Sequence, residues 1–122
     1  MNDKERALEV SSQILKINLN WFGQKHHSVA DSYLLRAQIF SCFNDFAESS
    51  EQFKLCIQSS IGSLHKDLPV IRLEYANFLL QHEKIEEAST QLKNAKKEFT
   101  DAGDDIHVQE ICELEKKIRL ST

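Results

Sequence analysis

The sequence contains few residues that interrupt a helix. Its 122 residues include one proline and three glycines, whereas 28% of the residues are charged. Proline and glycine are the strongest breaks in regular structure, and most charged residues are good helix formers. Apolar residues recur at spacings of three and four, and no segment alternates as a strand would. This pattern predicts an all-α chain of about six helices.

Long apolar runs and an excess of positive charge are also missing. No run approaches the roughly 20 apolar residues that a membrane span needs. The first residues, Met-Asn-Asp-Lys-Glu-Arg, lack the apolar core of a signal peptide. The formal net charge of -4 gives no electrostatic reason to bind phosphate backbones. We therefore expect a cytoplasmic protein with no membrane partner and no nucleic-acid partner.

Cysteines are few and widely spaced. Cys42, Cys56 and Cys112 are an odd number, and no Cys-x-x-Cys is present. A free cysteine packs as a small hydrophobe, and a reducing compartment disfavours disulfides. We expect each of the three to be a small buried thiol.

No group of residues has the spacing of an active site or a metal site. His26, His27 and His65 could hold a metal with the help of Asp31 or Asp67. Adjacent histidines in a helix connection usually point apart, however, and no fourth ligand is evident. Neither a cysteine with a histidine nor a pair of acids is singled out by spacing, and there is no Gly-rich phosphate loop. The sequence therefore predicts no enzyme, no metal and no cofactor.

The apolar periodicity and the positions of glycines and capping residues predict where the helices begin and end. The predicted segments of one domain, residues 1–122, are a leading helix at 3–19, a helical hairpin at 28–61, a second hairpin at 67–102 and a trailing helix at 105–120. The glycines at 23, 62 and 103 are expected to stop helices. Ser28 with Asp31 resembles a capping box, and Asp67 is expected to cap the next helix. In the leading helix, the expected buried stripe is Ala7, Val10, Ile14, Leu15 and Ile17.

The two hairpins repeat with a period of 39 residues. Ala37, Phe40, Ser49, Phe53 and Cys56 correspond in order to Ala76, Leu79, Ala88, Leu92 and Ala95. The order small, small, large at Ala37, Ser49 and Phe53 resembles that of tetratricopeptide repeats. The turn sequences Asn-Asp-Phe-Ala-Glu-Ser and Glu-Lys-Ile-Glu-Glu-Ala are similar to that family's turns, and the long period resembles the repeats of kinesin light chains. Arg36 and Arg72 depart from the family, because they stand where it usually has large apolar residues.

The resemblance implies a fold and a class of function. The fold would be antiparallel hairpins stacked as a short right-handed superhelix, an α-solenoid whose concave groove binds a peptide or a helix of a partner protein. The resemblance places seven residues in that groove: Asp31, Leu34, Gln38, Val70, Leu73, Asn77 and Leu80. The alternative for Leu34, Leu73 and Leu80 is a place in the core, which a register shifted by one residue would give them. Relatives that bind chaperone tails have basic residues where this chain has Leu34, Leu35 and Glu74, so such tails are not expected to bind.

Two functions remain open from the sequence. In the first, the chain is a protein-interaction scaffold that uses its groove. In the second, it is a structural or self-associating helical subunit that uses its open ends. About three repeats are normally needed for a stable stack, and this chain has two with one further helix on either side. A neighbouring protein or a homo-oligomer is therefore expected.

Overall fold

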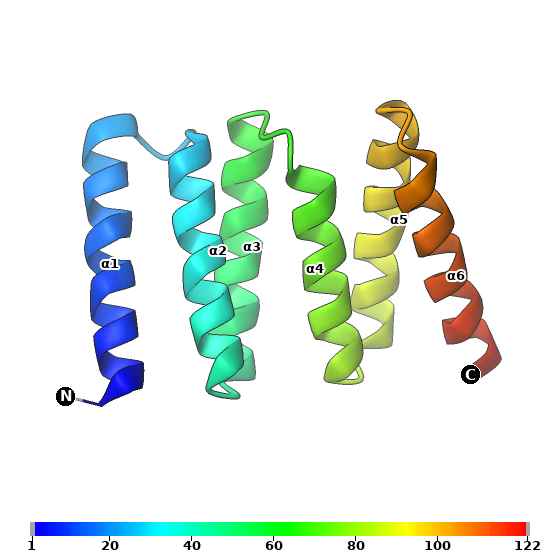
Figure 1. The fold of residues 1–122 in the computed structure, drawn as a ribbon, viewed down its shortest axis with the longest axis horizontal. Helices are drawn as coiled ribbons and strands as arrows, with labels where there is room; N and C mark the ends of the chain where they lie inside the picture. Colours follow the sequence, from blue (N-terminus) through cyan, green and yellow to red (C-terminus); the bar gives the residue numbers. More distant parts are fainter. Residues whose placement is uncertain (1, 122) are drawn as a thin grey trace. The chain divides into compact units, whose positions relative to one another are not determined.

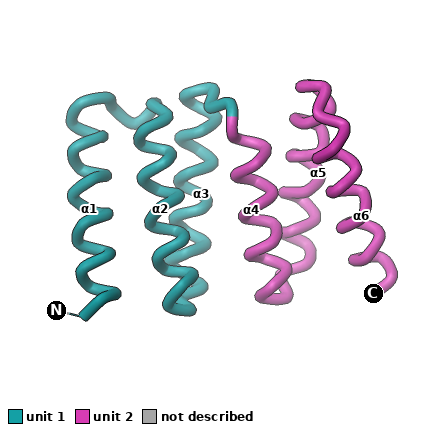
Figure 2. The backbone as a smooth tube through the Cα atoms, in the orientation of Figure 1, with its two compact units in different colours: residues 1–66 teal, residues 67–122 magenta. Residues whose placement is uncertain are grey.

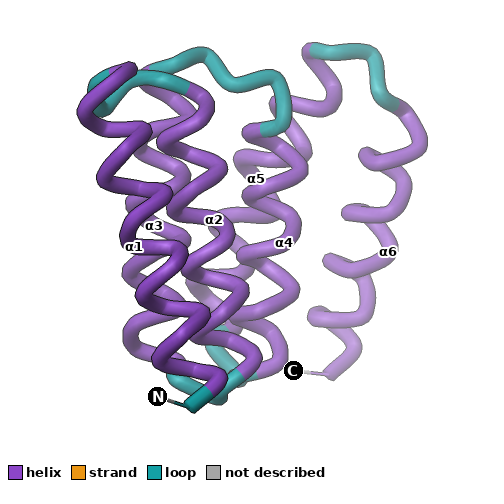
Figure 3. The backbone as a smooth tube through the Cα atoms, turned by 60° about the vertical axis from the view of Figure 1, so that its left-hand side comes forward, coloured by secondary structure: helices purple, strands orange, loops and turns teal. Residues whose placement is uncertain are grey.

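The computed structural model describes residues 2–121, and within them every regular element is a helix (Figure 1). The helices are α1 (Asp3–Phe22), α2 (His27–Cys42), α3 (Phe46–Gly62), α4 (Leu68–Gln81), α5 (Ile85–Asp101) and α6 (Asp105–Ser121). Short loops join them, as the colouring in Figure 3 shows. The all-α prediction with six helices is confirmed for the described residues.

The chain divides into two compact units (Figure 2). Unit 1 comprises residues 1–66 and contains α1, α2 and α3, whereas unit 2 comprises residues 67–122 and contains α4, α5 and α6. Each unit therefore holds one of the predicted hairpins and one further helix. Whether the two units unfold together as one domain stays a prediction.

In unit 1, the hairpin of α2 and α3 closes through small residues. The Ser49 hydroxyl donates a hydrogen bond of 2.7 Å to the carbonyl of Ala37, and neither residue is exposed. Asn44 makes the turn with a φ of +58°, a conformation that asparagine tolerates better than most residues. The carboxylate of Asp45 then accepts from the backbone N–H of Glu48 and caps α3.

In unit 2, the hairpin of α4 and α5 is extended by α6 into one core. Ala76 and Ala88 are both fully buried, as their small size at a helix crossing predicts. The buried cluster comprises Leu73, Ala76, Leu92, Ala95, Phe99 and Ile111. Glu83 makes the turn with a φ of +61°, 39 residues after Asn44. The two turns therefore follow the repeat.

The predicted bounds agree with the structure to within one residue, except that α1 continues to Phe22 instead of ending at residue 19, but several predicted caps are wrong. The cap of α2 is His26, whose Nδ1 accepts from the backbone N–H of Ser28 over 3.1 Å, so Ser28 and Asp31 form no capping box. Asp67 makes no side-chain cap bond to α4. α3 ends at Gly62 as predicted, but the left-handed residue that follows the helix is Leu64, with a φ of +54°, and not the glycine. Gly23 and Gly103 do have positive φ and end their helices as predicted.

Two predictions about burial also need correction. The expected buried stripe of α1 is largely exposed: Val10 is 54% exposed and Ile17 is 55% exposed. Ser11 is instead the buried residue of that helix. Cys56 is buried as expected, but Cys42 is exposed at the end of α2.

Candidate functional site

The predicted groove residues of unit 1 lie on the accessible side of α2. Asp31 and Gln38 are exposed and Leu34 is partly exposed. The carboxylate of Asp31 lies 3.0 Å from Nε2 of His65, whose side chain is only 6% exposed. One predicted contact residue is therefore held in place by a histidine from the end of this unit.

The predicted groove residues of unit 2 divide into two groups. Val70 and Asn77 are exposed and Leu80 is partly exposed, so these three can reach a partner. Leu73 is 7% exposed and packs in the cluster that contains Ile111 of α6. The assignment of Leu73 to an open groove is therefore wrong, because α6 supplies part of the core that buries it.

A second accessible surface, which sequence reasoning assigned to the core, lies on α1. We call it the α1 stripe, and it consists of Val10, Ile14, Ile17 and Trp21. Their spacings of four, three and four place them on one side of the helix. Their exposed fractions are 54%, 38%, 55% and 79%. A row of large apolar side chains in water is typical of a surface that another protein covers.

α1 packs against α2 through a different side, which makes several hydrogen bonds to α2. Nη1 of Arg36 donates to the carbonyl of Leu8 over 3.3 Å and to the hydroxyl of Ser11 over 3.1 Å. Farther along, the amide of Asn18 donates to the hydroxyl of Ser32 over 2.8 Å. These hydrogen bonds fix the rotation of α1 about its axis. The α1 stripe is therefore turned away from α2.

Unit 1 also contains an open cavity of about 390 Å³. Its lining comes from all three helices of the unit: Ser12, Leu15, Lys16, Leu19, Asn20, Tyr33, Arg36, Gln52 and Leu55. Oε1 of Gln52 is buried and makes no hydrogen bond in the described part of the chain. The mixed lining contains no arrangement of nucleophile, base and orienting group.

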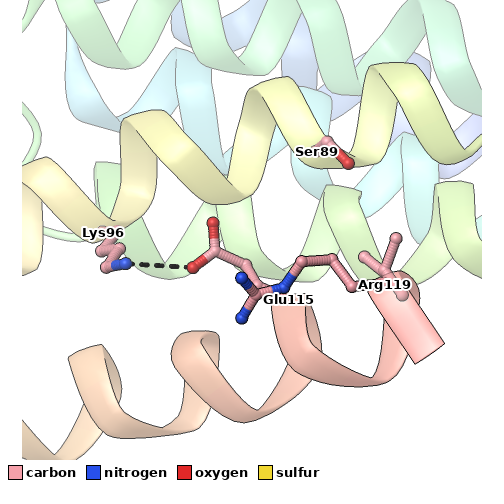
Figure 4. Close-up of a pocket in the computed structure, with 5 residues that line it drawn as sticks. Ser89, Lys96, Glu115 and Arg119 are labelled. Atoms are coloured by element: carbon pink, nitrogen blue, oxygen red, sulfur yellow. Dashed lines mark hydrogen bonds and ion pairs between the residues drawn. The ribbon is translucent and has the colours of Figure 1, made fainter.

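Unit 2 has a smaller cleft of about 330 Å³ between α5 and α6 (Figure 4). Its lining includes Ser89, Lys96, Glu115 and Arg119, and Nζ of Lys96 lies 3.1 Å from Oε1 of Glu115. The hydrogen bond and negative charge of Glu115 raise the pKa of Lys96 above its usual value of 10.5. Lys96 is therefore charged at neutral pH and joins the two helices.

The histidines at the end of unit 1 make ring contacts with one another. The His26 ring lies 4.1 Å from the His27 ring, and the His27 ring meets the His65 ring edge-on at 6.1 Å. Over residues 2–121, no three histidine, cysteine or acidic side chains gather in a way that could hold a metal ion. His26 caps a helix, and His65 makes a hydrogen bond with Asp31.

Comparison with known proteins gives no match for this chain. No protein-family model matches it, and neither do any curated protein or any solved structure. Within residues 2–121, no helix combines the length and the apolar character that crossing a bilayer requires.

Proposed function

We propose that this protein is a protein-interaction module of tetratricopeptide-like helical hairpins that binds a helix or peptide of a partner protein in the cytoplasm. The observation that carries the proposal is the α1 stripe, in which four large apolar side chains are 38% to 79% exposed on one side of one helix. Leaving such side chains in water costs free energy that a partner would recover on binding. The 39-residue repeat and the all-helical fold support the same class of function.

Three groups of residues are available for this function. The first is the α1 stripe of unit 1. The second comprises Asp31, Leu34 and Gln38 on α2 of unit 1, and the third comprises Val70, Asn77 and Leu80 on α4 of unit 2. The α1 stripe is favoured because it is entirely apolar and includes Trp21, which is 79% exposed. A structural or self-associating role remains the alternative, and it would use the same stripe.

Affinity capture with matched variants tests the proposal. The protein is immobilised in extract from its source cells as wild type, as Ile17→Glu, as Leu34→Glu with Leu80→Glu, and as Gln58→Glu. Gln58 is an exposed position of α3, a helix that carries none of these candidate residues, so its variant serves as a charge-matched control. We expect a partner that Gln58→Glu retains and Ile17→Glu loses. If every protein recovered with wild type is recovered equally with all variants, the proposed function is wrong.

A further inference from the structure

The residues of the α1 stripe have counterparts in the second helix of each hairpin. Counting forward by the 39-residue period leads from Val10, Ile14, Ile17 and Trp21 to Ser49, Phe53, Cys56 and Ser60 in α3, and then to Ala88, Leu92, Ala95 and Phe99 in α5. All eight counterparts are at most 3% exposed. The same face of the helix is therefore buried in α3 and α5 and open in α1.

The contacts of α3 and α5 show what covers this face. In unit 1, the hydroxyl of Ser49 touches the backbone of α2 at Ala37. In unit 2, Leu92 and Ala95 lie in the cluster that contains Ala76 of α4. In both hairpins the first helix of the same hairpin thus contributes to the cover, and in unit 2 Ile111 of α6 belongs to the same cluster. α1 corresponds to a second helix whose first helix is not among the described residues.

We infer that the α1 stripe binds an amphipathic helix of a partner protein, which lies antiparallel to α1 and takes the place of the first helix of a hairpin. The antiparallel direction follows from the two hairpins, in which turns of three residues, 43–45 and 82–84, reverse the chain. The inference rests on the proposed function as an interaction module, and it specifies the surface and the chemistry of the partner.

The side chains of the α1 stripe define the face that the partner helix must present. Val10 and Ile17 are larger than their counterparts Ser49 and Cys56, so the partner needs small residues opposite them to approach as closely as α2 approaches α3. From Val10 to Trp21 the helix rises about 17 Å, at 1.5 Å per residue. An apolar face about three turns long, with alanine, glycine or serine at its centre, fits this surface.

A second copy of this chain does not offer such a face. α2 and α4 are already paired with α3 and α5 in their own hairpins. α6 is the counterpart of α2 and α4 by the 39-residue period, but it has Glu115 where they have Ala37 and Ala76. Glu115 is large, charged and held in an ion pair with Lys96. The helices α2, α4 and α6 of a second copy therefore do not supply the missing helix.

A tethered helix tests the inference directly. A copy of residues 26–43, which includes α2, is joined through a flexible Gly-Ser linker to the amino terminus of the full chain. Its 16-residue helix, about 24 Å long, is long enough to cover the α1 stripe. Trp21 is the one tryptophan of the sequence and is 79% exposed, so its fluorescence reports on the surface. In the control, the tethered copy carries Ala37→Glu and Phe40→Glu.

We expect the tethered copy to shift Trp21 emission to shorter wavelength and to lower its quenching by iodide several-fold, and we expect the control copy to do neither. Equal quenching of both tethered proteins would overturn the inference. So would an untethered protein that dimerises as its concentration rises while Trp21 becomes protected, because the occupant would then be a second copy.

The outcomes separate this inference from the proposed function. A partner lost by Leu34→Glu with Leu80→Glu but kept by Ile17→Glu would overturn the inference and leave an interaction module that uses its groove. In another outcome, the tethered helix protects Trp21 but no variant loses a partner. The α1 stripe would then be a face that binds a helix, but the proposed function, and with it the assignment of that helix to a partner protein, would be overturned.

Discussion

Arg72 of α4 donates a hydrogen bond of 2.8 Å from Nε to Oε1 of Glu98 in α5, with side chains 11% and 28% exposed. Nη1 of Arg72 also donates to Oε1 of Gln91 over 3.1 Å. Arg72 stands where the resembling family has an apolar residue, and its two acceptors explain how unit 2 tolerates a buried cation there. The pair joins the two helices of the hairpin.

Removing the carboxylate of Glu98 should lower the free energy of unfolding more than removing the cation of Arg72. Glu98→Ala leaves Arg72 buried without its carboxylate, and we expect the free energy of unfolding to fall by about 1 to 3 kcal/mol, less than for a fully buried pair because Glu98 is partly exposed. Arg72→Met removes the cation but keeps an apolar stem, and we expect a smaller loss. Urea unfolding measures both, and a larger loss for Arg72→Met would contradict this account.

The left-handed residue after α3 offers a stabilising substitution. Leu64 has a φ of +54° and is 89% exposed, whereas its counterpart 39 residues later is Gly103. Relief of left-handed strain in a non-glycine residue outweighs the entropy that glycine adds to the unfolded chain, so Leu64→Gly should raise the free energy of unfolding by about 0.5 to 1 kcal/mol.

The neighbouring residue provides the control for this substitution. Ser63 has a φ of -94° in the right-handed region. Ser63→Gly therefore gains no relief and should lower stability slightly. Equal effects of the two substitutions in thermal unfolding would show that the strain at Leu64 is not relieved by glycine.

The small residue at the second crossing limits the space between α4 and α5. Ala88 is fully buried, and its neighbour Ser89 is exposed. Ala88→Leu should overpack the hairpin and lower the free energy of unfolding by about 1 to 3 kcal/mol. Ser89→Leu should change it little. Unchanged unfolding of Ala88→Leu would mean that the repeat register is wrong.

The start of α6 should make stability depend on acid pH. The backbone N–H of His107 donates to the carboxylate of Asp104 over 3.1 Å, and this bond, followed by the bond from the His107 side chain, lowers the pKa of Asp104 below its usual value of 3.8. A lowered pKa in the folded state stabilises the protein at pH values above 3.8, and the stabilisation is lost as pH falls through the folded pKa.

Substitution of the carboxylate isolates this contribution. Asp104→Asn keeps a capping oxygen but removes the titrating group. We expect the thermal midpoint of wild type to fall more steeply than that of Asp104→Asn as the pH is lowered below about 4. Parallel curves for the two proteins would show that Asp104 does not contribute to the acid dependence.

Local sequence patterns were sufficient to predict the helices and their crossings. The repeat placed Ala76 and Ala88 at buried crossings, and Gly103 ended α5 as its conformational freedom suggests. α3 also ends at Gly62, but there Leu64 adopts the left-handed conformation, despite a side chain that disfavours it. The preference of one residue cannot reveal a turn whose conformation the surrounding helices determine.

The site could be predicted only in part, because burial depends on neighbours that the sequence does not name. Leu73 is apolar at a groove position, and only the packing of Ile111 from α6 shows that it is core. In α1 the prediction fails in the other direction, because residues that were expected to be buried are exposed. An apolar pattern selects Ile14 and Ile17 as the packed side, whereas Arg36 holds the helix through polar groups and leaves them exposed.

Photo-crosslinking in the source cells tests the central claim most directly. A photoreactive amino acid is placed at Ile17 in the α1 stripe and, in a separate protein, at Leu80 in the predicted groove. We expect Ile17 to crosslink to one short segment of a partner protein, at residues three or four apart as on the face of a helix, and we expect Leu80 to give no such product. Crosslinks from Leu80 to a partner with none from Ile17, or crosslinks from Ile17 only to other copies of this chain, would contradict the claim that the open face of α1 binds a partner helix.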